Sequence, residues 1–401
     1  MRLGVLLPRY GVDVVGGTEH WLRMLAEHLV DRLGWDVEVF TTCAVSAVTW
    51  ADEMPAGTSE LHGVTVHRFP SLSGRDPAYG RLDPVIRRDP KRVTDELAHL
   101  FVELVGPVCP AAIDAAEKSG NHLIAITPYL FWPAVHAVPR LGRRVLFHGA
   151  AHDEPELHLR IMRPVYCAVG GFAFNSFAER SLVERTFPVA HLPSSVIGNA
   201  VVERDGDPAA ARAALGLDPD EPFALCVGRV ERGKGAHVLA EMWRLYRRRR
   251  PGVPRLVFLG PVNEALEGSV DVVVAGPHSE AVKWGALKSA QVVVNPSAFE
   301  SFSLVVVEAW LAGRAVVVNG RCAATVEACR RSGGGLWFSG YASFEALMDR
   351  LLGDADLRAQ LGASGERYAR ELFDWDAIVG RYADLAERVL TANGQGPRPA
   401  R

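Results

Sequence analysis

Short runs of apolar residues alternate with amphipathic stretches along the chain. In the first half, continuous apolar runs predict β-strands at Leu3–Leu7, Val37–Thr41, Val64–Phe69, Leu123–Ile126, Val145–Phe147 and Phe172–Phe174. After the first strand, one face of a predicted helix carries Leu22, Leu25, Ala26, Leu29 and Leu33. Continuous apolar strands are typical of parallel sheets that helices cover on both faces. The segment 71–92 is polar and rich in Pro, Gly and Arg, and we expect it to be irregular.

The same alternation begins again after the middle of the chain. A charged segment with Gly and Pro, 201–208, marks a linker. Beyond it, strands are expected at Phe223–Val227, Arg255–Leu259, Val270–Val274, Val292–Asn295, Ala315–Val318 and Leu336–Phe338, and Trp375–Leu390 predicts a last amphipathic helix. Two β/α series joined by a linker predict an α/β protein with two Rossmann-like domains, 1–202 and 203–374, on either side of a cleft.

Composition and charge narrow the class of protein. The chain has 401 residues, of which 48% are hydrophobic and 23% charged, so it can bury sizeable cores. Its formal charge of −3 argues against a general nucleic-acid binder, although a local basic site for phosphate is compatible with it. No run approaches 18 apolar residues, which argues against a transmembrane helix, and the first apolar run is too short for a signal peptide.

The cysteines point to a reducing compartment. They stand at positions 43, 109, 167, 226, 322 and 329, and none forms a C-x-x-C pair. This spacing does not suit a zinc site or a disulfide framework. We therefore expect buried free thiols in a cytoplasmic protein.

The segment 228–235, with the sequence GRVERGKG, follows an expected strand and opens an expected helix. Backbone N–H groups and the positive end of the dipole at such a helix start suit a phosphate, and Arg229 and Lys234 add two cations. The spacing approaches that of a nucleotide-triphosphate P-loop. However, Gly235 stands where a Ser or Thr would bind magnesium, which argues against an ATPase. A tight turn with surface cations is the alternative.

A second segment, 295–308, carries two glutamates, eight residues apart, around a strand-to-helix turn. We expect Ser303 to cap the helix, which leaves nearby backbone N–H groups to meet a phosphate. Glu308 lies within an apolar run, and a buried carboxylate needs hydrogen-bond donors. A ribose diol or sugar hydroxyls would supply them, and a solvated helix face is the alternative.

The G-R-x-x-x-x-K-G turn and the E-x-F-x-x-x-x-x-E segment together resemble the retaining glycosyltransferases of family GT4, which have the GT-B fold. The resemblance covers nearly the whole chain and includes Gly16–Glu19, Val196–Val201 and Phe373–Asp376. It implies two Rossmann-like domains facing across a cleft, with a helix at about 375–392 packing back on the first domain. The first domain would bind the acceptor, and the second would bind a nucleotide sugar.

The resemblance also implies roles for individual residues of the second domain. Arg229 and Lys234 match the cations that neutralise the donor diphosphate. Glu308 matches the carboxylate that binds the donor ribose, and Glu300 matches the one that holds hydroxyls of the transferred sugar.

Two backbone segments match the family as well. The backbone of Phe302, Ser303 and Leu304 matches the turn that contacts phosphate and sugar, although the family usually has Gly at position 303. Gly16 and Gly17 match a loop that approaches the diphosphate from the first domain, where glycine permits close approach of the backbone.

Histidines form the remaining candidates for chemistry. His148 follows an expected strand and matches a family histidine that faces the donor sugar and the reaction centre. His152 and Asp153 come soon after it and would line the acceptor side. A loop residue with satisfied hydrogen bonds is the alternative for each histidine, and no general base is assigned.

Basic residues gather in the segment 71–92, at Arg75, Arg81, Arg87, Arg88, Lys91 and Arg92. They are compatible with contact to anionic lipid at the inner face of a membrane, with an acceptor loop, and with a plain surface loop.

Asp374 and Asp376 form a D-x-D pattern that metal-dependent transferases of another fold use. Here they open a predicted helix, where acidic residues favour the dipole.

These features predict an enzyme that moves a sugar from a nucleoside-diphosphate sugar to an acceptor hydroxyl with retention of anomeric configuration. The acceptor would be a saccharide, a lipid-linked molecule or a small molecule, and the catalytic residues would be His148, Glu300, Arg229 and Lys234. Because these cations and helix starts would stabilise the leaving diphosphate, we expect neither a metal nor a further cofactor.

Other functions share parts of this pattern. A sugar-nucleotide epimerase of the same fold would have the same diphosphate site, and a non-catalytic protein would bind the sugar nucleotide without turnover. A Rossmann oxidoreductase would need G-x-G-x-x-G after a strand, which the first loop does not supply.

Overall fold

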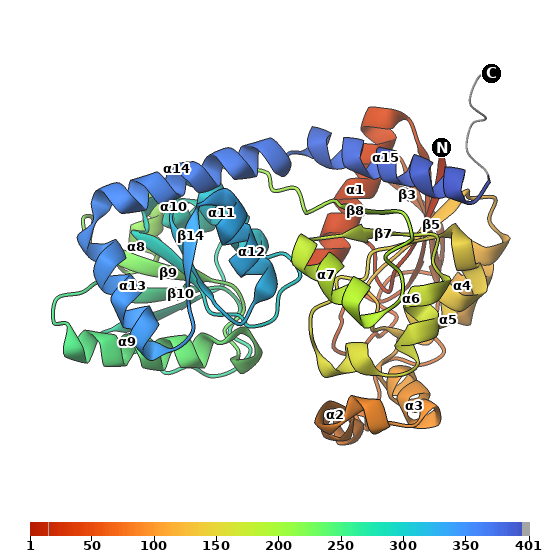
Figure 1. The fold of residues 1–401 in the computed structure, drawn as a ribbon, viewed down its shortest axis with the longest axis horizontal. Helices are drawn as coiled ribbons and strands as arrows, with labels where there is room; N and C mark the ends of the chain where they lie inside the picture. Colours follow the sequence, from red (N-terminus) through yellow and green to blue (C-terminus); the bar gives the residue numbers. More distant parts are fainter. Residues whose placement is uncertain (15, 395–401) are drawn as a thin grey trace. The chain divides into compact units, whose positions relative to one another are not determined.

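The computed structural model describes residues 1–14 and 16–394, which form two compact units (Figure 1). One unit combines Met1–Gly198 with the described residues from Trp375 to Gly394, and the other is Asn199–Asp374. Each unit is an α/β fold around a mainly parallel sheet, as the apolar runs predict.

The sheet of the first unit has the strand order β3-β4-β2-β1-β5-β6-β7-β8. Strand β3 pairs antiparallel with β4, and the other neighbouring strands described pair in parallel. The strands are β1 (Arg2–Leu6), β2 (Asp36–Thr42), β3 (Gly57–Leu61), β4 (Val64–Phe69), β5 (Leu123–Ile126), β6 (Val145–Phe147), β7 (Gly171–Phe174) and β8 (Ser194–Val196).

Helices of the first unit connect and cover these strands (Figure 1). They are α1 (Gly17–Leu33), α2 (Tyr79–Arg88), α3 (Asp95–Val105), α4 (Pro110–Lys118), α5 (Trp132–Leu141), α6 (Met162–Ala168), α7 (Phe177–Thr186) and α15 (Trp375–Ala392). Short 3-10 turns are η1 (Pro90–Arg92), η2 (Gly142–Arg144) and η3 (Pro155–His158).

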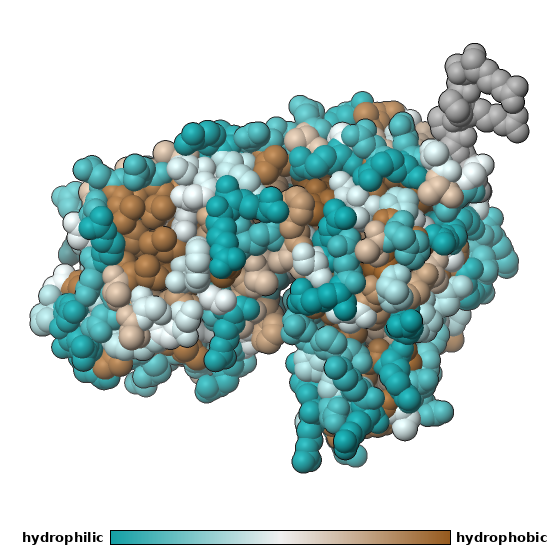
Figure 2. Space-filling view, viewed as in Figure 1, coloured by the Kyte–Doolittle hydropathy of each residue, from teal (hydrophilic) through white to brown (hydrophobic). Residues whose placement is uncertain are grey.

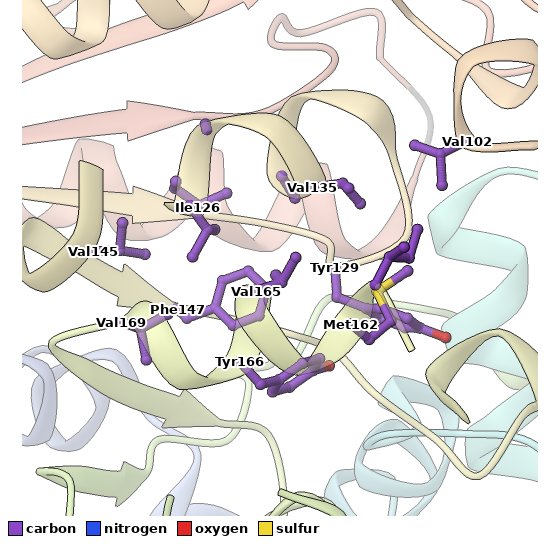
Figure 3. Packing of buried hydrophobic residues seen from close by; sticks show 14 of the residues in the cluster. Val102, Ile126, Tyr129, Val135, Val145, Phe147, Met162, Val165, Tyr166 and Val169 are labelled. Atoms are coloured by element: carbon purple, nitrogen blue, oxygen red, sulfur yellow. The ribbon is translucent and has the colours of Figure 1, made fainter. Parts of the chain in front are cut away.

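The core of this unit lies between the sheet and helices such as α5 and α6. Figure 3 shows Phe147 of β6 beside Val165 and Tyr166 of α6, and all three are fully or almost fully buried. The rings of Phe147 and Tyr166 meet edge to face, with centroids 5.3 Å apart. Burial of each such side chain stabilises the fold by about 1.5–3 kcal/mol, so the core holds the carboxyl end of β6 in place.

The C-terminal helix α15 packs back on the first unit, which confirms the arrangement that the family resemblance implies. It contacts α1, β7 and β8. Strand β7 begins with Gly171, where an added Cβ would lie only 2.5 Å from Cγ2 of Val389. Arg381 donates from Nη2 to the carbonyl of Ile197 at 2.8 Å, which ties the helix to the end of β8.

The sheet of the second unit has the order β11-β10-β9-β12-β13-β14, with each described neighbouring pair parallel. Its strands are β9 (Phe223–Val227), β10 (Arg255–Leu259), β11 (Val272–Gly276), β12 (Val292–Asn295), β13 (Val316–Asn319) and β14 (Gly335–Phe338). Its helices are α8 (Pro208–Ala214), α9 (Ala236–Arg249), α10 (Glu280–Ser289), α11 (Leu304–Leu311), α12 (Ala323–Ser332), α13 (Tyr341–Gly353) and α14 (Ala355–Leu372), with a 3-10 turn η4 (Arg232–Lys234).

Successive strands are added in opposite directions from the centre of this sheet: β10 and β11 lie on one side of β9, and β12, β13 and β14 lie on the other. In open α/β sheets, ligands bind outside the carboxyl ends of the strands at such a switch point. The two motifs of the second half leave the sheet here, because 228–235 follows β9 and 296–303 follows β12. The fold therefore places both motifs at one edge of one sheet.

The expectation that the segment 71–92 is irregular is wrong for much of its length. Residues Tyr79–Arg88 form α2, although Pro84 lies inside it. Ile86 is fully buried, and Nη2 of Arg87 lies 2.7 Å from Oε1 of the buried Glu156. Packing against α3 and η3 thus stabilises a helix that local composition disfavours.

The hydrophobic pattern of the sequence did not predict the strands that have few apolar residues. Strand β3 is almost entirely exposed, and β8 is a three-residue strand of partly buried Ser and Val. Strand β11 begins two residues later than the pattern predicts. The remaining predicted strands match the structure to within one residue at each end.

Candidate functional site

The turn after β9 packs closely against the segment that follows β12. Gly235 has φ of 77°, in the left-handed region, and an added Cβ there would lie 2.7 Å from the carbonyl oxygen of Pro296. Only glycine fits this position without moving one of the two segments. The turn η4 precedes Gly235, and α9 begins at the next residue. Glycine at 235 therefore brings the two motifs into contact.

An ion pair joins the same two motifs. Nζ of Lys234 lies 2.9 Å from Oε1 of Glu300, and both side chains are partly buried. Arg229, whose side chain is more than half exposed, lies 3.2 Å from Glu231. The Arg229 guanidinium is well solvated, so its pair with Glu231 contributes about 0–1 kcal/mol, and a bound anion can replace the Glu231 carboxylate as its partner.

The turn into α11 differs from the expected cap. Ser303 is the residue before the helix, but its hydroxyl makes no hydrogen bond to the first turn, so the prediction that it caps α11 is wrong. Instead, Nδ2 of Asn295 donates to Oγ of Ser303 at 2.8 Å. The backbone of Ser303 has φ of 87°, which side chains other than glycine rarely adopt. The hydroxyl thus contacts Asn295 rather than the first turn of the helix.

The residues on either side of Ser303 have different surroundings. The ring of Phe302 meets Phe373 edge to face at 5.0 Å and packs against the core, while Leu304 is the first residue of α11. With no side-chain cap at Ser303, the N–H groups at the start of α11 are available to an anion.

Glu308 is held by a lysine that the sequence pattern did not indicate. Its side chain is only 12% exposed, and Oε1 accepts a hydrogen bond from Nζ of Lys283 at 2.7 Å. Lys283 also lies 2.9 Å from Glu280, its neighbour on α10. Burial raises the pKa of the Glu308 carboxyl, and the Lys283 ammonium offsets part of that rise. Glu308 thus lies in a low-dielectric environment rather than on a solvated helix face.

In the first unit, His148 stands at the carboxyl end of β6 and is 3% exposed. Its Nε2 lies 3.1 Å from the hydroxyl of Tyr382 on α15, and its ring lies 5.2 Å from that of Trp21 on α1. Burial lowers the pKa of His148 to about 3, so the ring is neutral. No local sequence pattern could indicate that Tyr382 contacts His148, because the two residues are 234 positions apart in the sequence.

The loop after His148 is held by a buried carboxylate. Glu179 accepts hydrogen bonds from the backbone N–H of Ala151 at 2.8 Å and of Asn175 at 2.7 Å. Ala150 has φ of 53°, in the left-handed region. Burial raises the pKa of Glu179 to about 7, although these backbone donors lower it in part. The carboxylate therefore fixes an unusual loop conformation beside His148.

The other two candidates near His148 are more exposed. His152 lies 3.4 Å from Glu154, and Asp153 lies 2.7 Å from His158 with more than half of its side chain exposed. These contacts are compatible with the loop alternative as well as with a role toward an acceptor.

The two glycines before α1 are unequal. An added Cβ on Gly16 would lie 2.3 Å from Oε2 of Glu19 and 2.9 Å from Nη2 of Arg9, whereas Gly17 has open space around it. Arg9 and Glu19 form a buried ion pair, with Nε of Arg9 donating to Oε1 at 3.1 Å. This pair gives a physical reason for glycine at 16 in addition to the expected approach of a diphosphate.

Comparisons with known proteins agree with this architecture. Residues 221–354 match the family described as "Glycosyl transferases group 1". The chain is 34% identical to a D-inositol 3-phosphate glycosyltransferase of Frankia alni, over 92% of this chain and 93% of that protein. It is 27% identical to one of Stackebrandtia nassauensis, over 98% and 93% of the two chains.

Solved structures share the fold over nearly the whole chain. Sucrose-phosphate synthase from Thermosynechococcus elongatus superposes with a TM-score of 0.72 at 19% identity, covering 98% of this chain and 99% of that one. Anabaena HepE in complex with UDP-glucose has a TM-score of 0.66 at 18% identity, covering 98% and 100%.

Two Rossmann-like units with a C-terminal helix returning to the first define the GT-B class of fold. The chain belongs to the group 1 glycosyltransferases, family GT4, enzymes that use nucleotide sugars.

Two observations concern metals and membranes. Among residues 1–14 and 16–394, no group of three or more His, Cys, Asp or Glu side chains is placed to hold a metal ion. Metal independence stays a prediction. No helix among the described residues is long and apolar enough to cross a membrane. The surface over α2 and α3 is mostly hydrophilic (Figure 2). Arg81 and Arg88 of α2 are exposed.

Proposed function

We propose that the protein transfers a sugar from a nucleoside diphosphate to an acceptor hydroxyl with retention of anomeric configuration and without a metal. The observation that carries this proposal is the contact between Lys234 and Glu300 at the switch point of the second sheet. It brings a cation suited to a diphosphate next to a carboxylate suited to sugar hydroxyls. The bond that breaks in transfer is the one that joins the diphosphate of the donor to its sugar.

Each part of the donor has matching groups in the second unit. Lys234, Arg229 and the free N–H groups at the start of α11 supply positive charge for the diphosphate. The buried carboxylate of Glu308 can accept hydrogen bonds from ribose hydroxyls, with Lys283 balancing its charge.

Positive groups that face the leaving diphosphate lower the barrier because negative charge develops there in the transition state. One donor of this kind typically contributes about 10²–10³ in rate. On binding, the diphosphate competes with Glu300 for Lys234, which frees the Glu300 carboxylate for hydroxyls of the transferred sugar. In the first unit, His148 is the candidate to hydrogen-bond a substrate oxygen.

The comparisons suggest which substrates to test first. HepE, with the same fold, is described in complex with UDP-glucose, and the relatives in Frankia and Stackebrandtia are named for D-inositol 3-phosphate. We therefore place UDP-glucose first among donors, and D-inositol 3-phosphate first among small-molecule acceptors, with saccharides following.

The test combines binding with product analysis. A thermal-shift screen over UDP-, GDP-, ADP- and TDP-sugars should show one preferred nucleotide, and Lys234→Ala and Glu308→Ala should abolish its shift. Lys288→Ala is the matched control, since Lys288 lies on the same unit and pairs with Glu203. If both site variants bind the donor as well as the wild type, the assignment of the donor site fails.

Product NMR tests the reaction itself. The anomeric configuration of the donor should be kept in the product, and EDTA should leave the rate unchanged. An inverted product would overturn retention, and loss of activity in EDTA would overturn metal independence. Conversion of the donor sugar to another sugar without acceptor would identify an epimerase instead.

A further inference from the structure

His148 and Tyr382 form an isolated polar pair inside the first unit. Tyr382 is fully buried on α15 and His148 is 3% exposed, and their rings lie 5.4 Å apart. The single hydrogen bond between them joins Nε2 of His148 to the tyrosine hydroxyl at 3.1 Å. Nδ1 of His148 is also buried, and it has no hydrogen-bond partner among the residues that the structure describes.

The direction of that hydrogen bond follows from a count of donors and acceptors. A neutral imidazole carries one N–H and one bare nitrogen, and a tyrosine hydroxyl has one proton to donate. If Tyr382 donates to Nε2, the pair leaves only the N–H at Nδ1 without a partner. If Nε2–H donates to Tyr382 instead, both the tyrosine proton and the bare Nδ1 lack a partner. Each buried unsatisfied group is costly, so the first arrangement is favoured.

The surroundings keep both groups in the protonation states that this count assumes. Burial lowers the pKa of His148 to about 3, so the ring holds a single proton at neutral pH. Burial raises the pKa of Tyr382, so its hydroxyl keeps the proton that it donates. Trp21, the other aromatic neighbour of the histidine ring, carries no titratable group.

We infer that Tyr382 is a positioning residue that fixes His148 in the Nδ1–H tautomer, which leaves the buried N–H at Nδ1 as the one group of the pair that a substrate oxygen can satisfy. The inference rests on the proposed function and adds the direction of the contact. In this tautomer Nδ1 already holds a proton and Nε2 is occupied by Tyr382. His148 therefore acts as a hydrogen-bond donor to the substrate and not as its general base.

The C-terminal helix thereby gains a functional role. The backbone oxygens of the β8 segment hold α15 in place, because Arg381 donates to Ile197 and Arg388 donates to Ser194 at 3.2 Å. These contacts fix the position of α15 against the sheet, and with it the position of Tyr382 relative to β6. The helix Trp375–Ala392 thus supplies the hydrogen-bond partner for Nε2 of a histidine that lies 234 positions earlier in the chain.

The tautomer can be observed directly in the free protein. Protein labelled with ¹⁵N-histidine gives long-range ¹H–¹⁵N correlations that distinguish the two neutral tautomers, and His148→Gln identifies the signal. The wild type should show the Nδ1–H form, and Tyr382→Phe should shift the signal toward a mixture. Tyr10→Phe is the matched control, since Tyr10 is buried in the same unit and its hydroxyl has no partner among the described residues.

Kinetics test the consequence for the substrate. Tyr382→Phe should lower kcat by roughly five- to tenfold, the value of one neutral hydrogen bond, with Tyr10→Phe unchanged. An Nε2–H signal in the wild type, or an unchanged signal in Tyr382→Phe, would overturn the inference. A shifted tautomer with unchanged kcat would overturn the role toward substrate. Since the NMR measurement needs no substrate, failure of the wild type to turn over any sugar nucleotide counts against the proposed function alone.

Discussion

The ammonium of Lys283 on α10 lies 2.7 Å from Oε1 of Glu308 on α11, in a largely buried ion pair. Burial favours the protonated form of a carboxyl group, and a nearby cation opposes this. Lys283 thus keeps Glu308 closer to its charged form, and charged acceptors make hydrogen bonds about twice as strong as neutral ones. The pair therefore links the strength of the candidate ribose contact to a residue outside both sequence motifs.

Lys283→Met should weaken donor binding. Without the ammonium, the pKa of Glu308 rises further, so a larger share of the carboxyl is protonated and its charge-assisted contacts to the ribose weaken. We expect KM for the donor to rise about tenfold and to fall again as pH increases, because the carboxylate re-ionises. KM measured from pH 6 to 9 tests this. Lys283→Arg should restore the wild-type profile, and Lys288→Met is the control on the same helix. An unchanged KM for the donor in Lys283→Met would contradict this role.

Ser303→Gly should relieve backbone strain. The residue sits at φ of 87°, and a side chain in such a conformation costs about 1–3 kcal/mol. Ser303→Ala removes the same hydroxyl but keeps a Cβ, so the difference between the two variants isolates the backbone. We expect the glycine variant to be more stable than the alanine variant by about 1–3 kcal/mol in urea unfolding. Equal stabilities would show that the turn is not strained.

Glu179 should make the stability of the protein fall as pH rises from about 4.5 to about 7. Its pKa in the folded protein is about 7, above the ordinary value, so in this range the native state binds more protons than the unfolded state. At about 1.4 kcal/mol per pH unit, the full effect is roughly 3 kcal/mol. Glu179→Gln does not titrate, so the wild type should lose that much stability relative to the variant between pH 4.5 and 7.5. Urea unfolding at both pH values tests this, and a pH-independent difference would refute it.

Gly365→Ala should destabilise the second unit. An added Cβ on this residue of α14 would lie 2.2 Å from Cδ1 of the fully buried Trp310 on α11. The tryptophan cannot easily retreat, because its Nε1 donates to the carbonyl of Gly334 at 2.9 Å. Overpacking of this kind costs about 1–3 kcal/mol.

Gly380→Ala is the matched control for that substitution. Gly380 lies inside α15, and apart from its chain neighbours and the nearby helix backbone no atom lies within 4 Å of an added Cβ. Alanine there should leave stability unchanged or raise it by up to about 1 kcal/mol, because alanine favours a helix. A thermal unfolding experiment on both variants separates helix propensity from steric conflict, and equal midpoints would mean that α11 and α14 adjust without cost.

The amino-acid sequence by itself determined the elements whose apolar pattern is local. Val292–Asn295 is a strand because an unbroken apolar run suits a sheet covered on both faces, and the structure gives it the same bounds. The two motifs also follow from sequence, since Gly, Lys and Glu at fixed spacing after a strand are typical of a phosphate and sugar site. The exposed strand β3 and the helix α2 lacked such a signal.

Only the tertiary structure decided which side chains meet. The order of strands in the sheet brings β9 beside β12, and thereby Lys234 to Glu300. Similarly, Lys283 reaches Glu308 across two helices, and Tyr382 reaches His148 from the far end of the chain. The physical reason is that an apolar period records how each segment is buried, whereas an ion pair or a hydrogen bond requires a distance that exists only once separate elements have packed together.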